Sequence, residues 1–135
     1  MEKLFLDAEN STMGRLASYA AKQALLGNEI AVLNCEKAII SGRKEDVIED
    51  YKERRQLNTI KPTKGPFFSS HPERIMKRTI RGMLPDFRQG RGKIAWRKVR
   101  CYIGIPEEFK KEKMINLKMD TRDKKITLKE LQEKM

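Results

Sequence analysis

Apolar positions in the first forty residues follow two patterns that predict a strand–helix–strand unit. Residues 4–6 form a short apolar run, which predicts a strand, and a polar turn follows it. From 13 to 26 the alanine and leucine positions recur at helical spacing. The unbroken apolar run at 30–33 is typical of a strand covered on both faces. A strand, a helix and a second strand within this length predict a crossover unit with a parallel sheet.

The ends of the predicted helix carry recognised signals. Ser11 or Thr12 can cap its N-terminus with a hydroxyl oxygen, and Gly27 ends it. The apolar triplet at 38–40 predicts a further short strand. Because so many of the aliphatic residues fall in the first forty positions, we expect the core mainly in the N-terminal half of the chain.

The middle of the chain predicts two more helices separated by a loop. Residues 43–55 form a helix with its apolar residues on one face. Two prolines and a glycine mark 58–70 as a loop. The sequence Ser-His-Pro-Glu at 70–73 has the form of a capping box with a proline in the first turn, and 82–85 ends the helix that it opens.

The helix that follows 70–73 is strongly two-sided. At about 100° per residue, its basic residues fall within one narrow sector and its apolar residues lie opposite. The basic sector holds Arg74, Lys77, Arg78 and Arg81, and the apolar side holds Ile75, Met76, Thr79, Ile80 and Met83. One face is therefore expected to pack and the other to display positive charge.

The pattern changes again after this helix. The Gly-Arg-Gly sequence at 90–92 predicts a flexible cationic loop, and 93–97 predicts one or two helical turns. From 98 to 103 the period becomes two, which predicts a strand with a basic outer face. Its inward residues would be Val99, Cys101 and Ile103. Further on, acidic and basic residues alternate, and a second capping box at 127–130 predicts a short C-terminal helix.

These elements together predict a single α/β domain of three layers. Helices would cover both faces of a mostly parallel sheet of about four strands, with a basic helix and loop extension. Residues 1–109 would form this domain, including a basic region at 52–100. Residues 110–135 would form a charged C-terminal tail with a short helix.

The positive charge of the chain is confined to one region. Residues 52–100 hold fifteen Lys and Arg against three acids, a net charge of +12, while the other 86 residues sum to −1. A basic block of this size is typical of polyanion binding, because each cation that meets a phosphate releases condensed counterions. A solvated charged surface or a disordered basic tail is the alternative. The aromatic and aliphatic residues interleaved in the block favour a folded region.

Motifs for catalysis or metal binding are weak. The turn at 8–16 ends at a helix N-terminus, where phosphate can bind, but Gly14 is its only glycine and no nucleotide-binding pattern is met. His71 is the only histidine, and Cys35 and Cys101 stand apart in the sequence, as suits a reducing cytoplasm. We therefore expect no catalysis, metal, cofactor or small-molecule substrate. A small nucleotide-binding α/β enzyme is the weaker alternative.

Cations from several elements are candidates for RNA contact, because an Arg guanidinium takes two phosphate oxygens and also stacks on bases. Phe67, Phe68 and Trp96 either stack on exposed bases or pack inside the protein. The candidate RNA-binding residues are Arg15, Arg54, Arg55, Lys61, Lys64, Arg74, Lys77, Arg78, Arg81, Arg88, Arg91, Lys93, Arg97, Lys98 and Arg100.

DNA and a membrane surface are two alternative partners for the basic region. Charge alone does not separate RNA from DNA, but the sequence has no helix-turn-helix pattern or finger spacing that would place a helix in a major groove. A membrane surface is disfavoured, because the apolar face of the helix after 70–73 is only about three turns long and is more useful inside a fold. We expect no membrane partner.

Several strings occur here in the order in which they occur in a known family. They are Asp7-Ala8, Gly14-Arg15-Leu16-Ala17-Ser18, Ala21-Lys22, Val32-Leu33-Asn34-Cys35-Glu36, Ile40-Ser41-Gly42, Gly65-Pro66-Phe67, Pro72-Glu73-Arg74-Ile75, Arg78-Thr79-Ile80-Arg81-Gly82-Met83-Leu84-Pro85 and Tyr102-Ile103-Gly104-Ile105-Pro106. Over about Leu4 to Phe109 the chain resembles the universal large-subunit ribosomal protein thirteen (L-thirteen) family. The eighth string is the most specific. The Gly-Ile-Pro ending resembles the archaeal and eukaryotic branch, and the absence of the long eukaryotic C-terminal extension favours the archaeal type.

The resemblance implies a three-layer α/β fold and a non-catalytic role. It implies a cytoplasmic structural constituent of the large ribosomal subunit that binds and bridges large-subunit ribosomal RNA, meets neighbouring large-subunit proteins and supports assembly. By position, the basic residues at 74–81 and the segment at 90–93 would contact RNA. Some relatives act off the ribosome, so an RNA-binding translational regulator is the alternative.

Overall fold

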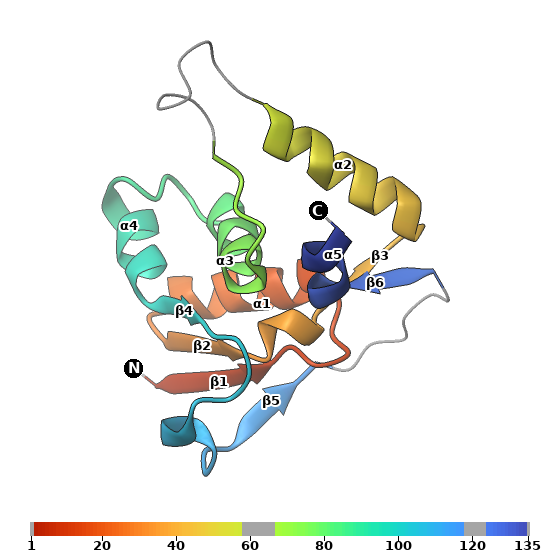
Figure 1. Cartoon of the computed structure of the whole chain (residues 1–135). Helices are drawn as coiled ribbons and strands as arrows, with labels where there is room; N and C mark the ends of the chain where they lie inside the picture. Colours follow the sequence, from red (N-terminus) through yellow and green to blue (C-terminus); the bar gives the residue numbers. More distant parts are fainter. Residues whose placement is uncertain (1, 58–66, 118–123, 135) are drawn as a thin grey trace.

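The computed structural model describes residues 2–57, 67–117 and 124–134 (Figure 1). Most of the loop predicted at 58–70 therefore lies outside the described residues. The elements in chain order are β1 (Lys3–Asp7), α1 (Met13–Leu25), β2 (Glu29–Leu33), the 3-10 helix η1 (Cys35–Lys37), β3 (Ile39–Ser41), α2 (Lys44–Gln56), α3 (Pro72–Gly82), α4 (Gly90–Arg97), β4 (Val99–Cys101), the 3-10 helix η2 (Glu107–Phe109), β5 (Met114–Asn116), β6 (Lys125–Thr127) and α5 (Leu128–Lys134).

The centre of the molecule is a parallel four-stranded sheet in the order β4-β2-β1-β5 (Figure 1). β1 and β2 pair along their whole lengths, from Lys3 opposite Glu29 to Asp7 opposite Leu33. The apolar run of β2 is buried throughout, as expected for a strand covered on both faces. The predicted strand–helix–strand unit and the α/β class with a mostly parallel sheet of four strands are confirmed.

The two faces of this sheet are covered differently. Successive strand residues point to opposite faces, so Leu6 and Val32 join the core formed with α1 and α3, while Phe5 and Leu33 point the other way. On that second face the packing residues come from η2, β5 and the segment before η2. The ring of Phe109 lies 5.0 Å from that of Phe5. Within the described residues, the helical cover on this face is therefore a single 3-10 turn.

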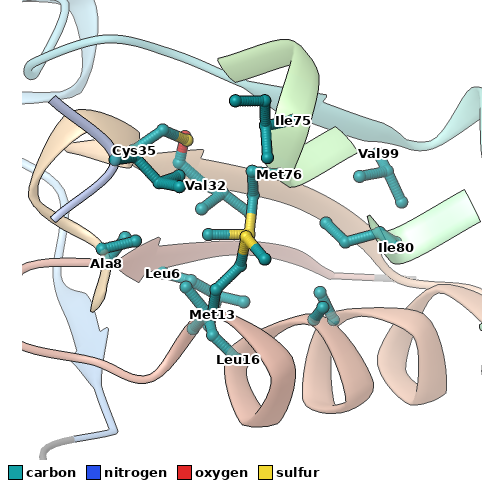
Figure 2. Close-up of a cluster of buried hydrophobic side chains, with 14 of the residues drawn as sticks. Leu6, Ala8, Met13, Leu16, Val32, Cys35, Ile75, Met76, Ile80 and Val99 are labelled. Carbon is teal, nitrogen blue, oxygen red and sulfur yellow. The ribbon is translucent and has the colours of Figure 1, made fainter. Parts of the chain in front are cut away.

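The helix α3 is anchored in the main core. Its Ile75, Met76 and Ile80 are buried and lie against Met13 and Leu16 of α1 and against the sheet (Figure 2). Each such side chain contributes about 1.5–3 kcal/mol on burial. The predicted packing face is confirmed in these three residues. The prediction that Met83 belongs to this packing face is wrong, because Met83 lies after the end of the helix and is 43% exposed.

The three predicted helix N-termini have different outcomes. The N-cap of α1 is Thr12, but no side-chain hydrogen bond caps the helix. The N-cap of α3 is His71, so α3 begins one residue later than the capping box at 70–73 predicts, and no side chain caps it. At α5 the prediction is confirmed, because the backbone N–H of Glu130 donates to Thr127 Oγ1 at 3.2 Å.

The flexible loop predicted at 90–92 is instead the first turn of α4. Gly92 is buried against the backbone carbonyl groups of Pro85 and Asp86, where a Cβ atom would overlap them. Here glycine permits close contact between two backbone segments, not flexibility. The sequence pattern does not distinguish these two uses of glycine.

The strand predicted at 98–103 is shorter than its alternating pattern suggests. β4 ends at Cys101, and Ile103, predicted to face inward, is 53% exposed. Beyond β4 the chain stays beside the segment that follows β2, where the backbone N–H of Asn34 donates to the carbonyl of Gly104 at 3.0 Å. Gly104 has a φ of +67° and donates its own N–H to Glu36 Oε2 at 3.0 Å. Tyr102 packs edge-on against Phe109, with 5.5 Å between ring centroids.

The C-terminal segment is built into the fold. β5 extends the main sheet beside β1, and β6 pairs with β3 in a separate antiparallel sheet. Ile126, Leu128 and Leu131 are buried in the main core. Among the described residues, most of the buried hydrophobic side chains lie in the N-terminal half, as the aliphatic composition predicts, and the C-terminal segment completes the core.

The two cysteines are neighbours in space, although they are 66 positions apart in the sequence. The pairing of β2 with β4 places Cys101 opposite Val32, close to the turn that carries Cys35. A hydrogen bond with Cys101, together with burial, raises the pKa of the Cys35 thiol. Both thiols are free, and a raised pKa keeps Cys35 protonated and unreactive at neutral pH.

Candidate nucleic-acid interface

The solvent side of α3 carries four cations, Arg74, Lys77, Arg78 and Arg81, which we call the cationic face. Arg74 and Arg78 are exposed, and Lys77 and Arg81 are half-buried. They share one side of the helix because the apolar residues on the opposite side are fixed in the core. The structure therefore confirms that these four residues lie together and reach the surface.

Aromatic rings lie beside three of these cations. Lys77 Nζ is 4.9 Å from the ring centroid of Trp96 in α4. The guanidinium carbon of Arg78 is 4.6 Å from the ring of Phe68, and that of Arg81 is 4.7 Å from the ring of Phe87. A ring face attracts a cation by about 0.5–1 kcal/mol at an exposed site without cancelling its charge. The rings therefore position the cations and leave their charge available to a ligand.

The salt bridges found among the described residues lie outside the cationic face. They join Lys37 to Glu9, Arg43 to Asp46, Lys44 to Glu130, and Arg54 to Asp50, at 3.2–3.8 Å. All are exposed, and each such pair typically contributes only about 0–1 kcal/mol. Their position matters more than their strength, because it leaves the charge of the cationic face uncompensated by described carboxylates.

Phe68 connects α2 to the cationic face. Its ring meets that of Tyr51 edge-on, with 5.5 Å between centroids, and the guanidinium of Arg54 lies 5.7 Å from it. Burial raises the pKa of the Tyr51 phenol, although Arg54 acts in the opposite direction. Tyr51 is thus a neutral packing residue, and Phe68 stands between cations of two helices.

Phe87 extends the same surface beyond the end of α3. The guanidinium of Arg88 lies 5.4 Å from its ring, and the ring meets Trp96 edge-on at 6.5 Å. Of the candidate residues, the structure brings together Arg54, Lys77, Arg78, Arg81 and Arg88 beside these rings, and Arg74 lies with them on the cationic face of α3. For Phe68 and Trp96 the sequence offered either base stacking or core packing, and it missed that these two rings and Phe87 lie beside cations.

Three further candidates form a second group at the β4 edge of the sheet. Arg97, Lys98 and Arg100 border a hollow of about 130 Å³ together with Lys3 and one acidic residue, Glu29. The four cations are called the second basic patch. Lys98 Nζ donates to the carbonyl of Gly27 at 3.0 Å, which fixes its position. Sequence reasoning missed Lys3, because it lies at the start of the chain and only the pairing of strands brings it to this edge.

The remaining candidates lie apart from both groups. Arg15 on α1, Arg55 on α2, and Arg91 and Lys93 on α4 are exposed, but they do not line the hollows at the cationic face or the second basic patch. Lys61 and Lys64 fall outside the described residues.

The turn after β1, considered above for nucleotide binding, is unsuited to phosphate. The carboxylate of Asp7 lies there and accepts hydrogen bonds from Asn34 Nδ2 and from the backbone N–H of Glu9, each at 3.0 Å. A carboxylate in this position repels a phosphate. Gly14 lies inside α1 and does not form a phosphate-binding loop. These features count against the nucleotide-binding alternative.

Neither a metal-binding cluster nor a membrane-spanning helix is present in the described part of the chain. No group of three His, Cys, Asp or Glu side chains there is arranged to hold a metal ion. Across residues 2–57, 67–117 and 124–134, no helix is long and apolar enough to cross a membrane.

Comparison with known proteins identifies the family. Residues 2–108 match the family model of ribosomal protein L13. The chain is 44% identical to large ribosomal subunit protein uL13 of Archaeoglobus fulgidus over 132 residues, which span 93% of this chain and 83% of that protein. It is 40% identical to the protein of the same name from Methanosarcina barkeri, over 96% of this chain and 95% of that one, and 41% identical to that of Methanocaldococcus jannaschii, over 93% and 92%. The resemblance seen in the sequence motifs is confirmed: this chain belongs to the ribosomal protein L13 family.

Proposed function

We propose that this protein is a structural constituent of the large ribosomal subunit that binds and bridges large-subunit ribosomal RNA. Its family is one of ribosomal proteins and not of enzymes, and its relatives are named as proteins of the large subunit. The observation that carries the proposal is the cationic face of α3. Aromatic rings hold three of its four cations in position, and the salt bridges of the described residues do not cancel its charge.

The mechanism is electrostatic clamping by a rigid surface. Each cation that meets a phosphate releases condensed counterions, and an Arg guanidinium can take two phosphate oxygens at once. Because α3 is fixed in the core, RNA segments that repel one another can be held against it at small entropic cost. The second basic patch at the β4 edge supplies a separate point of contact, so one protein bridges two segments. Neighbouring large-subunit proteins are further partners in the cytoplasmic ribosome.

Co-sedimentation tests this proposal. A tagged form of the protein is followed from a cell lysate through a high-salt gradient, beside a variant in which Arg74, Lys77, Arg78 and Arg81 are all changed to Glu. A matched control carries the same charge change on exposed residues of the C-terminal segment. The control substitutions are Lys110→Glu, Lys111→Glu, Lys113→Glu and Lys129→Glu. Circular dichroism confirms that each variant is folded.

The unchanged protein and the control should migrate with the large subunit after the salt wash, and the α3 variant should not. Migration of the unchanged protein with smaller RNA complexes would favour the off-ribosome regulator. If the folded α3 variant stays on the large subunit, the cationic face is not the contact surface.

A further inference from the structure

A pocket of about 420 Å³ lies between the cationic face and its aromatic neighbours. The cationic face lines it together with Phe67, Phe68 and Trp96. These residues come from the segment that precedes α3, from α3 itself and from α4, which lie side by side in Figure 1. The volume falls in the range of about 300–1,000 Å³ that is usual for small-molecule sites in proteins. Phosphate clamping on a flat surface does not require such a pocket.

Phe67 is the most exposed large apolar side chain among the described residues, at 73%. It is nevertheless held in place, because Arg78 Nη1 donates to its backbone carbonyl at 3.1 Å. The next residue, Phe68, is half-buried against Tyr51 and fixes the same segment. An exposed ring on a restrained backbone loses little conformational freedom when a ligand covers it. Core packing, the alternative open from the sequence, is therefore correct for Phe68 and wrong for Phe67.

The lining selects a ligand that is both flat and anionic. A phosphate alone gains nothing from an exposed Phe ring, and an apolar peptide would leave the cations of α3 desolvated and unpaired. A nucleotide unit satisfies both requirements, because its base has a π-face that stacks on aromatic rings and its phosphate pairs with Arg and Lys. Such a base is accessible only where it is not stacked within a helix.

We propose that this pocket binds an unpaired base of large-subunit ribosomal RNA, stacked on Phe67, with the adjoining phosphate on the cationic face. This inference rests on the proposed function and deepens it, since it adds recognition of RNA shape to recognition of charge. Trp96 forms the α4 wall of the pocket, with Lys77 beside its ring. Ser69 also lines it, and its Oγ accepts the backbone N–H of His71, so the hydroxyl hydrogen can be donated to a base edge.

Substitutions at Phe67 separate stacking from simple apolar contact. Phe67→Ala removes the ring, Phe67→Leu keeps an apolar side chain without a ring, and Phe67→Tyr keeps the ring. The matched control is Leu26→Ala, which truncates an apolar side chain that is 67% exposed at the end of α1. Affinity is measured for purified large-subunit ribosomal RNA of Archaeoglobus fulgidus, the source of a 44% identical relative.

Loss of one stacked base should weaken binding by about 5- to 150-fold in Phe67→Ala and Phe67→Leu. Phe67→Tyr and Leu26→Ala should bind as the unchanged protein does. If Phe67→Leu binds as well as Phe67→Tyr, or Phe67→Ala as well as the control, while binding still depends on salt and on the cationic face, the pocket proposal is overturned and the proposed function stands. If the unchanged protein does not bind this RNA, both are overturned.

Ultraviolet cross-linking of the same complex gives a second readout. After nuclease digestion, mass spectrometry should find a nucleotide adduct on Phe67 or on Trp96, the only tryptophan of the chain. Adducts confined to aromatic residues outside the pocket, such as Tyr19 on α1, would overturn the pocket even if the affinities had changed as expected.

Discussion

The helices α2 and α3 carry the same number of basic residues and use them in opposite ways. In α2, four basic side chains are interleaved with five acidic ones, and Arg54 pairs with Asp50 one turn away at 3.2 Å. In α3, four basic side chains are accompanied by one acid, Glu73, and the described neighbours of three of them are aromatic rings. The two helices meet at Phe68, so the contrast lies within one continuous surface.

The comparison shows that the number of cations does not define a polyanion-binding surface. A carboxylate four residues away on a helix attracts a cation but also neutralises its charge. An aromatic ring holds the cation and leaves its charge available to a phosphate. The two helices also differ in how many side chains they bury in the core. α2 buries only Tyr51 fully, while α3 buries Ile75, Met76 and Ile80 and is fixed relative to the sheet. A surface that binds phosphate therefore needs anchored, uncompensated cations.

Placing a carboxylate among the cations of α3, as in α2, should have the largest effect on RNA affinity. Lys77→Glu places a carboxylate one turn from both Arg74 and Arg81, where it compensates them and removes a third cation. We expect affinity for large-subunit ribosomal RNA to fall by about 10- to 150-fold or more, the size of one charge-assisted hydrogen bond at the least. Filter binding measures it. Lys77→Gln, which only removes one charge, is the control and should lose less; equal losses would contradict the role of compensation.

The contact of Lys77 with the ring of Trp96 depends on the position of α4, and the close packing of Gly92 fixes that position. Gly92→Ala forces a Cβ against the backbone carbonyl groups of Pro85 and Asp86, and we expect the free energy of unfolding to fall by about 1–3 kcal/mol, as is usual for overpacking. Denaturant titration measures it. Gly14→Ala, in α1 with no heavy atom within 4 Å of the added Cβ, should instead leave stability unchanged or raise it by about 0.5–1 kcal/mol. Equal effects of the two substitutions would show that α4 is not held by this contact.

Removing a carboxylate from α2 should make it resemble α3. Asp50→Asn frees Arg54, which already faces the ring of Phe68, so RNA affinity should rise a few-fold and the salt slope by about one unit. Asp46→Asn makes the same charge change but frees Arg43, outside the candidate surface. The prediction is wrong if both substitutions raise affinity equally, because net charge alone would then explain the gain.

The smallest effect concerns Tyr51, the packing partner of Phe68. Its pKa is raised in the folded protein, so its neutral form adds stability that is fully present below the unfolded pKa of about 10 and is lost as pH rises above it. Tyr51→Phe should therefore lose less stability than the unchanged protein between pH 9 and pH 11. Parallel thermal melts compare the two, and identical pH dependence would contradict the burial of a neutral phenol.

Strong periodicity is what made parts of this fold predictable. The apolar and basic residues of α3 recur at helical spacing, which correctly predicted the helix and its two faces. The unbroken apolar run of β2 correctly predicted a buried strand. The three-residue strands β5 and β6 were missed, because they lie in charged sequence and exist through pairing with strands β1 and β3, far away in the chain. The hydrogen bond between Gly104 and Glu36, which are far apart in the chain, likewise follows from no local pattern.

The candidate site also has a part that the sequence could predict and a part that it could not. The cationic face was predictable, because its residues share one helix and one sector. The rings that hold it come from three separate segments, so their use as cation partners follows only from the tertiary fold. Phe67 and Phe68 are adjacent in sequence and yet differ in exposure, because only Phe68 meets Tyr51.

The salt dependence of RNA binding tests the central claim most directly. Affinity for large-subunit ribosomal RNA is measured between 50 and 200 mM salt for the unchanged protein, for the variant with four Glu on α3 and for the matched variant with four Glu in the C-terminal segment. With about 6–10 phosphate contacts, the unchanged protein and the matched variant should lose about 10³–10⁵ in affinity over this range. The α3 variant should bind far more weakly, with a slope lower by about one unit for each lost contact. Equal slopes in all three proteins would contradict the claim that the uncompensated cations of α3 hold the RNA.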